Sequence, residues 1–446
     1  MPAKLAELTN RLRTLSAKPV PYDSCLPSCT ATMACDVAKE KYSNFFGPYF
    51  PPVSTPLHRW PCDDADTAQL TSKKTLLRKG LQLGLDRLRW RLALPAGPPN
   101  MSNAVGNEAN VLSICGGALA EMDLHGNITA AEQLVQLAFV RQRADGCLPW
   151  LPTEPYTTWD GHGTVLSYLQ LVPLLYRYGH LFSPQFLDFL RPKLARGLKF
   201  SFSASSSGLW YTNILIARIT NNILIGSWLN DTTAVAKGEA LLDTWLNFTH
   251  DNDGVFIHEY ESTFYFWNDI NALMPAAQYY QTSGSRPINR LRAVTDQVFA
   301  HMAASYFPPT HTMTGPHSRD YAFLDGKFYI IRGVWGGGIM GFTTAFFDPN
   351  ASAVTALHLS DLQNAVLYHT ITTDDGYRPP CEVVALAGSL EPRQVHSRQG
   401  LVSNVTSDRT VFIDPSVGYS AGSVSEDFVA VNCQSEDCPA YVYHDY

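Results

Sequence analysis

The chain has 446 residues, of which 45% are hydrophobic, 12% aromatic and 16% charged. This composition is typical of a globular protein and excludes a disordered scaffold, and the length suits one large domain or about two to three smaller ones. The formal net charge is −7 and no basic run occurs, so we expect no nucleic-acid partner. An anionic substrate is compatible with this charge, because a cleft can be locally positive on an acidic protein.

The cysteines and the glycosylation motifs bear on the cellular compartment. Of nine cysteines, Cys25, Cys29 and Cys35 have a spacing that does not fit a zinc site. Cys433 and Cys438 fit a local disulfide in a secreted protein, or plain thiols in a cytosolic one. Asn-x-Ser/Thr motifs favour the secretory route. The motifs begin at Asn100, Asn127, Asn230, Asn247, Asn350 and Asn404.

The first residues do not have the pattern of a signal peptide. Residues 1–17 predict an amphipathic helix in which charges interrupt the apolar positions. No apolar window of about 18 residues occurs, which predicts no transmembrane helix and no membrane partner. We therefore expect a protein of the secretory route whose targeting segment is not seen in this chain, with a cytoplasmic location as the alternative.

Changes of pattern along the chain predict three segments. Residues 1–70 are an N-terminal helix and an extended wrap, since the Pro-Pro pair in FFGPYFPPVSTP excludes regular structure there. Residues 71–370 form the helical catalytic domain. Residues 371–446 form a small irregular or β-rich tail packed on that domain, because RTVFI and FVAVNC alternate weakly.

The middle segment repeats the apolar spacing of amphipathic helices, for example at Leu166, Leu169 and Val172. Long and short loops alternate between these helices, which indicates stacked helical hairpins and a mainly α fold. We expect an α/α toroid, an incomplete barrel of helical hairpins, with the substrate groove on the rim that carries the long loops. Helices are predicted over residues 75–92, 107–123, 130–141, 164–178, 184–200, 212–229, 233–249, 264–281, 289–306 and 355–369.

The expected long loops carry aromatic residues that suit a carbohydrate groove. Trp159, Trp210 and Trp335 fall at or near loop ends. Pyranose rings stack on indole and phenol faces, so these residues together favour sugar binding. The alternative for each single tryptophan is a place in the core.

Two predicted helix starts carry polar candidates. In Trp159-Asp160-Gly161-His162, either Asp160 or His162 could act as an acid or base, or Asp160 could simply be the helix N-cap. In Tyr211-Thr212-Asn213, the Asn213 side chain could cap its helix or donate its amide to a substrate carboxylate. Asn222 lies further along the same helix and is expected to be a polar core residue.

Two polar stretches carry the strongest chemical signal, GVFIHEYESTFYFWNDINAL at residues 254–273 and GPHSRDY at residues 315–321. Together they offer imidazole, guanidinium and phenol groups, which can neutralise a carboxylate and move protons beside it. A structural role for a single loop histidine, or a local Arg–Asp pair, is the alternative. The residues concerned are His258, Glu259, Tyr260, Tyr265, His317, Arg319 and Tyr321.

Several common catalytic motifs are absent from the sequence, namely the P-loop, the Rossmann fingerprint, HExxH and G-x-S-x-G. A glycosidase would need two carboxylates across the groove, and no pair stands out among the candidates. These candidates are Asp160, Asp253, Glu259, Glu261, Asp269 and Asp320.

Three stretches resemble those of toroidal uronate lyases. The stretch HEYESTFYFWNDINAL resembles their His-Glu-Tyr-Asn-Ser-Pro-Thr-Tyr-Tyr motif and the helix after it. The stretch GPHSRDY resembles their Gly-Pro-His-Ser-Arg-x-Tyr motif. The stretch YTNILIARITNNILIG resembles a helix of these enzymes that starts with Tyr-Thr-Asn. The chain is similar here, over about residues 205–335, to polysaccharide lyase family thirty-eight. It departs from the motif at Glu261 and Thr263, and a carboxylate at Glu261 would repel a uronate unless it is paired or points away.

The resemblance implies an α/α toroid that cleaves 4-linked glucuronan or alginate by β-elimination, without a metal or cofactor. It implies that Arg319 and Asn213 neutralise the uronate carboxylate and that His258 and Tyr321 transfer protons, with Tyr265 as a substitute for one of them. An acidic polysaccharide is then the expected partner, and we expect a monomer. The expected binding residues are Trp159, His162, Trp210, Tyr211, Tyr260, His317 and Trp335.

Two other functions fit the same fold. One is a glycoside hydrolase that uses Asp160 together with Glu259 or Asp269. The other is a carbohydrate-binding toroid that keeps the groove without catalysis.

Overall fold

The computed structural model describes part of the chain in detail, and most of the described residues lie in α-helices. The prediction of a mainly α protein is therefore confirmed. The described ranges are residues 65–92, 110–151, 161–203, 212–251, 265–280, 290–307, 312–313, 362–380, 383, 386–387, 389–400, 406–414, 419–424 and 442–444.

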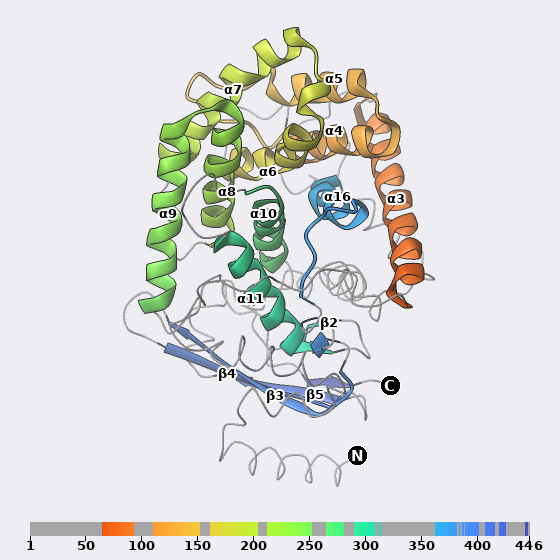
Figure 1. The fold of residues 1–446 in the computed structure, drawn as a ribbon, viewed down its shortest axis with the longest axis vertical. Helices are drawn as coiled ribbons and strands as arrows, with labels where there is room; N and C mark the ends of the chain where they lie inside the picture. The colour runs from red at the N-terminus through yellow and green to blue at the C-terminus, as the bar shows by residue number, and fades with distance from the viewer. Residues whose placement is uncertain are drawn as a thin grey trace.

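The helices alternate with connections of unequal length, as the sequence predicted (Figure 1). The α-helices are α3 (Ala65–Leu92), α4 (Val111–His125), α5 (Ile128–Phe139), α6 (Gly161–Tyr178), α7 (Pro184–Ser203), α8 (Thr212–Leu229), α9 (Thr232–Asp251), α10 (Tyr265–Tyr279), α11 (Arg290–Ser305) and α16 (Ala365–Thr372). Two 3-10 helices are η4 (Gly179–Leu181) and η8 (Leu362–Asn364).

The predicted helix bounds agree with the structure to within about four residues, except in α3 and α16. Helix α8 begins and ends where its apolar pattern predicts, whereas α3 begins at Ala65, well before the predicted start at Thr75. Its first turns, ADTAQLTSKK, are mostly polar, so they lack the periodic signal on which the prediction relied. Helix α16 begins only at Ala365, after the 3-10 helix η8, whereas the predicted start is residue 355. It continues to Thr372, past the predicted end at residue 369.

The segment bounds expected at residues 71 and 370 both fall inside helices, namely α3 and α16. The division of the chain into three segments stays a prediction.

Five helices pack in succession around a common core. Helix α4 packs on α6, α6 on α8, α8 on α10, α10 on α16, and α16 returns to α4. Helix α8 is buried along Thr212–Gly226, on all sides, as expected for a helix enclosed by others. Helices α3 and α5 pack against α4, and α7 and α9 pack against α8, with α9 on the outside of the molecule (Figure 1).

The carboxyl ends of three neighbouring inner helices meet. Tyr176 near the end of α6 donates its hydroxyl to the Leu224 carbonyl oxygen near the end of α8, at 2.9 Å. The ring of Tyr176 also contacts that of Tyr279, the last residue of α10, at 5.1 Å between centroids. These contacts indicate that α6, α8 and α10 run in the same direction, so their amino ends gather on the opposite side.

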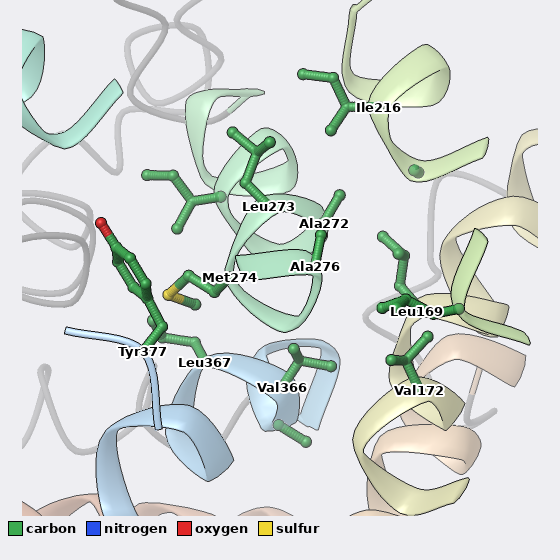
Figure 2. Close-up of a cluster of buried hydrophobic side chains, with 14 of the residues drawn as sticks. Leu169, Val172, Ile216, Ala272, Leu273, Met274, Ala276, Val366, Leu367 and Tyr377 are labelled. Atoms are coloured by element: carbon green, nitrogen blue, oxygen red, sulfur yellow. The ribbon is translucent and has the colours of Figure 1, made fainter. Parts of the chain in front are cut away.

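The space between these helices is filled with apolar side chains (Figure 2). Leu169 and Val172 of α6, Ile216 of α8, and Ala272 and Ala276 of α10 meet there, and all five are buried. Burial of such side chains contributes about 25 cal/mol per Å² of apolar surface, so this layer is a main source of stability.

The C-terminal segment forms an antiparallel sheet in the order β3-β4-β5-β6, which confirms the expected β-rich tail. RTVFI lies in β4, while FVAVNC lies outside the described residues. Arg393 at the start of β3 donates to the carbonyl oxygens of Ala304 and Tyr306, and so docks the sheet at the end of α11. The strands are β1 (Tyr306–Phe307), β2 (Thr312–Met313), β3 (Arg393–Gly400), β4 (Thr406–Asp414), β5 (Tyr419–Val424) and β6 (Val442–His444).

Candidate functional site

The structure describes three of the predicted site residues. These are His162, Asn213 and Tyr265, and of Tyr265 only its place as the first residue of α10 is described. All three lie in the first turn of their helices, α6, α8 and α10, whose amino ends lie on one side. The other predicted site residues lie outside the described residues: Trp159, Trp210, Tyr211, His258, Tyr260, His317, Arg319, Tyr321 and Trp335.

His162 is the second residue of α6 and is partly exposed. Its positions three and seven residues on are Val165 and Leu169, so the three side chains lie on one face of the helix. Leu169 points into the apolar layer between the inner helices (Figure 2). His162 therefore lies at the amino end of the face of α6 that is directed to the core.

Asn213 occupies the corresponding place on α8. It shares a face with Ile216 and Thr220, and its side chain is only 2% exposed. Its Oδ1 atom accepts a hydrogen bond from the Ile214 amide at 2.6 Å, so the carbonyl part of the side chain serves the helix start. The cap and the ligand roles considered for Asn213 are thus compatible, because the amide group is a separate donor.

Asp269 is the polar residue at the same level of α10. It lies three residues before Ala272 and seven before Ala276, on the face that these two residues direct to the core (Figure 2). Asp269 is 0% exposed, and neither carboxyl oxygen has a hydrogen-bond partner in the part of the chain that the structure describes. Burial raises the pKa of Asp269 well above its usual range, which favours the neutral acid.

Polar side chains in the middle of α8 fix its position against α6 and α10. The Asn221 amide donates to the Val165 carbonyl oxygen of α6 at 2.8 Å, and the Thr220 hydroxyl donates to the Ala272 carbonyl oxygen of α10 at 3.1 Å. Asn222, expected to be a polar core residue, is buried and donates to the Arg218 carbonyl oxygen of its own helix at 2.9 Å. These bonds hold the amino ends of the three helices in a fixed arrangement.

A second polar cluster lies at the opposite, carboxyl ends of the helices. His369 of α16 is fully buried, and its Nδ1 atom lies 2.9 Å from both carboxyl oxygens of Asp123 on α4. Its Nε2 atom lies 3.0 Å from the Tyr279 hydroxyl of α10. The Tyr178 hydroxyl of α6 donates to Asp123 at 2.7 Å.

The chemistry of this cluster follows from its burial. A carboxylate only accepts hydrogen bonds, so Nδ1 of His369 carries a proton toward Asp123, and in the neutral ring Nε2 accepts from Tyr279. Burial raises the pKa of Tyr279, and burial together with the Asp123 carboxylate raises that of Tyr178, so both phenols stay protonated at neutral pH. No local motif in the sequence predicts this cluster, since its members come from four separate helices.

The two cysteines described by the structure, Cys115 and Cys147, are buried free thiols. The candidate pair Cys433 and Cys438 lies outside the described residues. Among the described helices, none is long and apolar enough to cross a membrane.

The fold and the polar helix ends define a mainly α-helical protein with a small antiparallel sheet. Residues 145–373 match a family described as Domain of unknown function (DUF8769), and the chain belongs to this family. The match covers α6 to α11 and α16, and so includes the three helices whose amino ends carry His162, Asn213 and Asp269. No curated protein and no solved structure matches the chain.

Proposed function

We propose that the protein is a polysaccharide lyase that cleaves a 4-linked uronate polysaccharide of the glucuronan or alginate type on an α/α toroid. The succession of inner helices supports the toroid, since α16 returns to α4 while α3, α5, α7 and α9 pack against the inner helices α4 and α8. The resemblance of the 254–273 and 315–321 stretches to uronate lyases supports the reaction.

The single observation that carries the proposal is the position of Asn213. The motif that resembles the lyases predicts that this residue binds the uronate carboxylate, and it lies in the first turn of α8 beside the first turns of α6 and α10. The chain reaches α10 directly from the stretch that contains His258. A groove along these helix ends would bring His162 and Asn213 to one substrate.

In the proposed reaction Asn213 and Arg319 donate hydrogen bonds to the uronate carboxylate, which lowers the pKa of the adjacent C5 proton. One of His258 and Tyr321 accepts this proton as the C5–H bond breaks. The electron pair of that bond forms the C4–C5 double bond, and the C4–O bond to the next sugar breaks. The leaving oxygen takes a proton from the other of the two residues, so each cleavage yields one unsaturated sugar and one new chain end.

The test is incubation of the full chain with a panel of uronate polysaccharides, followed by ultraviolet absorbance of the unsaturated product. We expect a rise in absorbance with glucuronan or alginate, and its loss in His258→Ala and Tyr321→Phe variants that remain folded. Wild-type rates in both variants would overturn the assignment of these residues.

The same assay separates the two alternatives. New reducing ends without ultraviolet absorbance would indicate a glycoside hydrolase, for which the buried carboxyl group of Asp269 is a candidate acid. Binding of the polysaccharide without either product would indicate a carbohydrate-binding protein. Size-exclusion chromatography would test the proposed monomer.

A further inference from the structure

Two of the glycosylation motifs occupy equivalent corners of the helical fold. Asn127-Ile128-Thr129 lies between α4 and α5, and Asn230-Asp231-Thr232 lies between α8 and α9. In both corners an inner helix ends, the chain turns through a left-handed residue, and an outer helix begins. The left-handed residues are Gly126 with φ 59° and Asn230 with φ 60°.

At the α8–α9 corner the backbone is fixed by hydrogen bonds, while Asn230 is exposed at the surface. The Asn230 amide donates to the Ser227 carbonyl oxygen at 3.1 Å, and the Asp231 amide donates to that of Gly226 at 2.8 Å. The Asp231 carboxylate caps α9 by accepting from the Ala234 amide at 3.0 Å. Asn230 and Thr232 are both exposed, so the two residues of the motif that a glycosyltransferase reads stay at the surface.

At the α4–α5 corner the asparagine is itself the helix N-cap. Asn127 is exposed, and its Oδ1 atom accepts from the Ala130 amide at 3.2 Å. A glycan is attached to Nδ2, so the Oδ1 atom keeps its lone pairs and the cap is compatible with the modification. Thr129 is also exposed.

Both corners lie at the carboxyl ends of the inner helices. The hydrogen bond of Tyr178 with Asp123 brings the end of α4 to the end of α6, and the bond of Tyr176 with the Leu224 carbonyl oxygen brings the end of α8 there too. His162 and Asn213 are at the amino ends of their helices. A sugar chain at either corner is therefore directed away from the helix ends that carry the candidate site.

We propose that Asn127 and Asn230 are N-glycosylated, and that these two glycans cover the end of the molecule opposite the candidate site. The donor is an oligosaccharide linked to a lipid diphosphate. The bond between the first sugar carbon and the diphosphate oxygen breaks, a bond from that carbon to Nδ2 forms, and the amide nitrogen loses a proton as the lipid diphosphate leaves. This inference does not depend on the lyase reaction.

The threonine of each motif provides a clean test, because its replacement leaves the asparagine in place. Thr129→Ala keeps the Asn127 cap while it destroys the motif, and Thr232→Ala keeps Asn230 in its left-handed conformation. Thr129→Ser and Thr232→Ser are the matched controls, since serine preserves both motifs.

The experiment is secretion of the full chain from a eukaryotic host, behind an added leader, followed by enzymatic removal of glycans in heavy-oxygen water and peptide mass spectrometry. We expect the isotope label at Asn127 and Asn230, the loss of one glycan mass in each alanine variant, and retention of both in the serine variants. Unlabelled Asn127 and Asn230 in the secreted protein would overturn the proposal, whether or not other motifs carry glycans. Lyase activity, measured on the same four secreted variants, should be equal in all of them if the glycans lie away from the candidate site.

Discussion

His369 and Asp123 join the last inner helix of the described fold to the first. The Nδ1 atom of His369 lies 2.9 Å from both carboxyl oxygens of Asp123, although 246 residues separate the two in sequence. Tyr279 and Tyr178 complete the hydrogen bonds of this pair. The cluster therefore joins α4, α6, α10 and α16 near their carboxyl ends.

We expect His369→Ala to destabilise the protein by about 3 kcal/mol, because it removes the histidine partner of the Tyr279 hydroxyl and leaves the Asp123 carboxylate with Tyr178 but without the imidazole. The measurement is the free energy of unfolding from urea titration, monitored by circular dichroism. His125→Ala, at an exposed position at the end of α4, is the control and should change stability by less than about 0.5 kcal/mol. Equal effects of the two variants would show that the His369–Asp123 contact does not hold the helices together.

The buried carboxyl group of Asp269 predicts that the free energy of unfolding depends on pH. The pKa of Asp269 in the folded state lies well above its pKa in the unfolded chain. Its favourable contribution to the free energy of unfolding is therefore complete below about pH 4 and is lost as pH rises toward the folded-state pKa. Asp269→Asn cannot ionise. We therefore expect this variant to match the wild type in acid and to become more stable than it above about pH 4, by up to about 1.4 kcal/mol per pH unit.

The measurement is urea unfolding of both proteins across that pH range. The titratable side chains on helices that pack against α10 include Arg218 of α8, Tyr176 of α6, Asp296 of α11 and His369 of α16, and none of them pairs with Asp269. They are unchanged in the variant, so their titration cancels in the difference. A difference that does not change with pH would contradict a buried, neutral Asp269.

The packing of α4 against η8, the 3-10 helix directly before α16, can be tested separately. A Cβ atom added at Gly116 of α4 would meet the carbonyl oxygen of Leu362 in η8. We expect Gly116→Ala to cost about 1–3 kcal/mol, as overpacking in a well-filled core does. Gly126→Asn is the control, because asparagine tolerates the left-handed conformation at φ 59° and no atom lies within 4 Å of an added Cβ there. Unfolding free energies that do not differ between the two variants would contradict this packing.

The inner helices could be predicted from the sequence because each carries its own periodic apolar pattern. Helix α6 is a clear case, while the start of α3 was missed because its first turns are polar. The contact of His369 with Asp123 joins positions 246 residues apart and has no local signal. Asp269 was visible as a carboxylate, but the absence of a hydrogen-bond partner for it among the described residues depends on the packing of α10 and could not be predicted from the sequence.

Asn213 provides the sharpest test of the proposed lyase site. We expect Asn213→Ala to lower turnover of a uronate polysaccharide by about 10²-fold, because the loss of one donor to the developing negative charge has effects of this size. Asn222→Ala is the matched control, since Asn222 is equally buried on the same helix but more than two turns from its amino end. Both variants should lose similar stability in urea, so a common loss of turnover would mean that the effect comes from the fold. A loss confined to Asn213→Ala would place the substrate carboxylate at the start of α8.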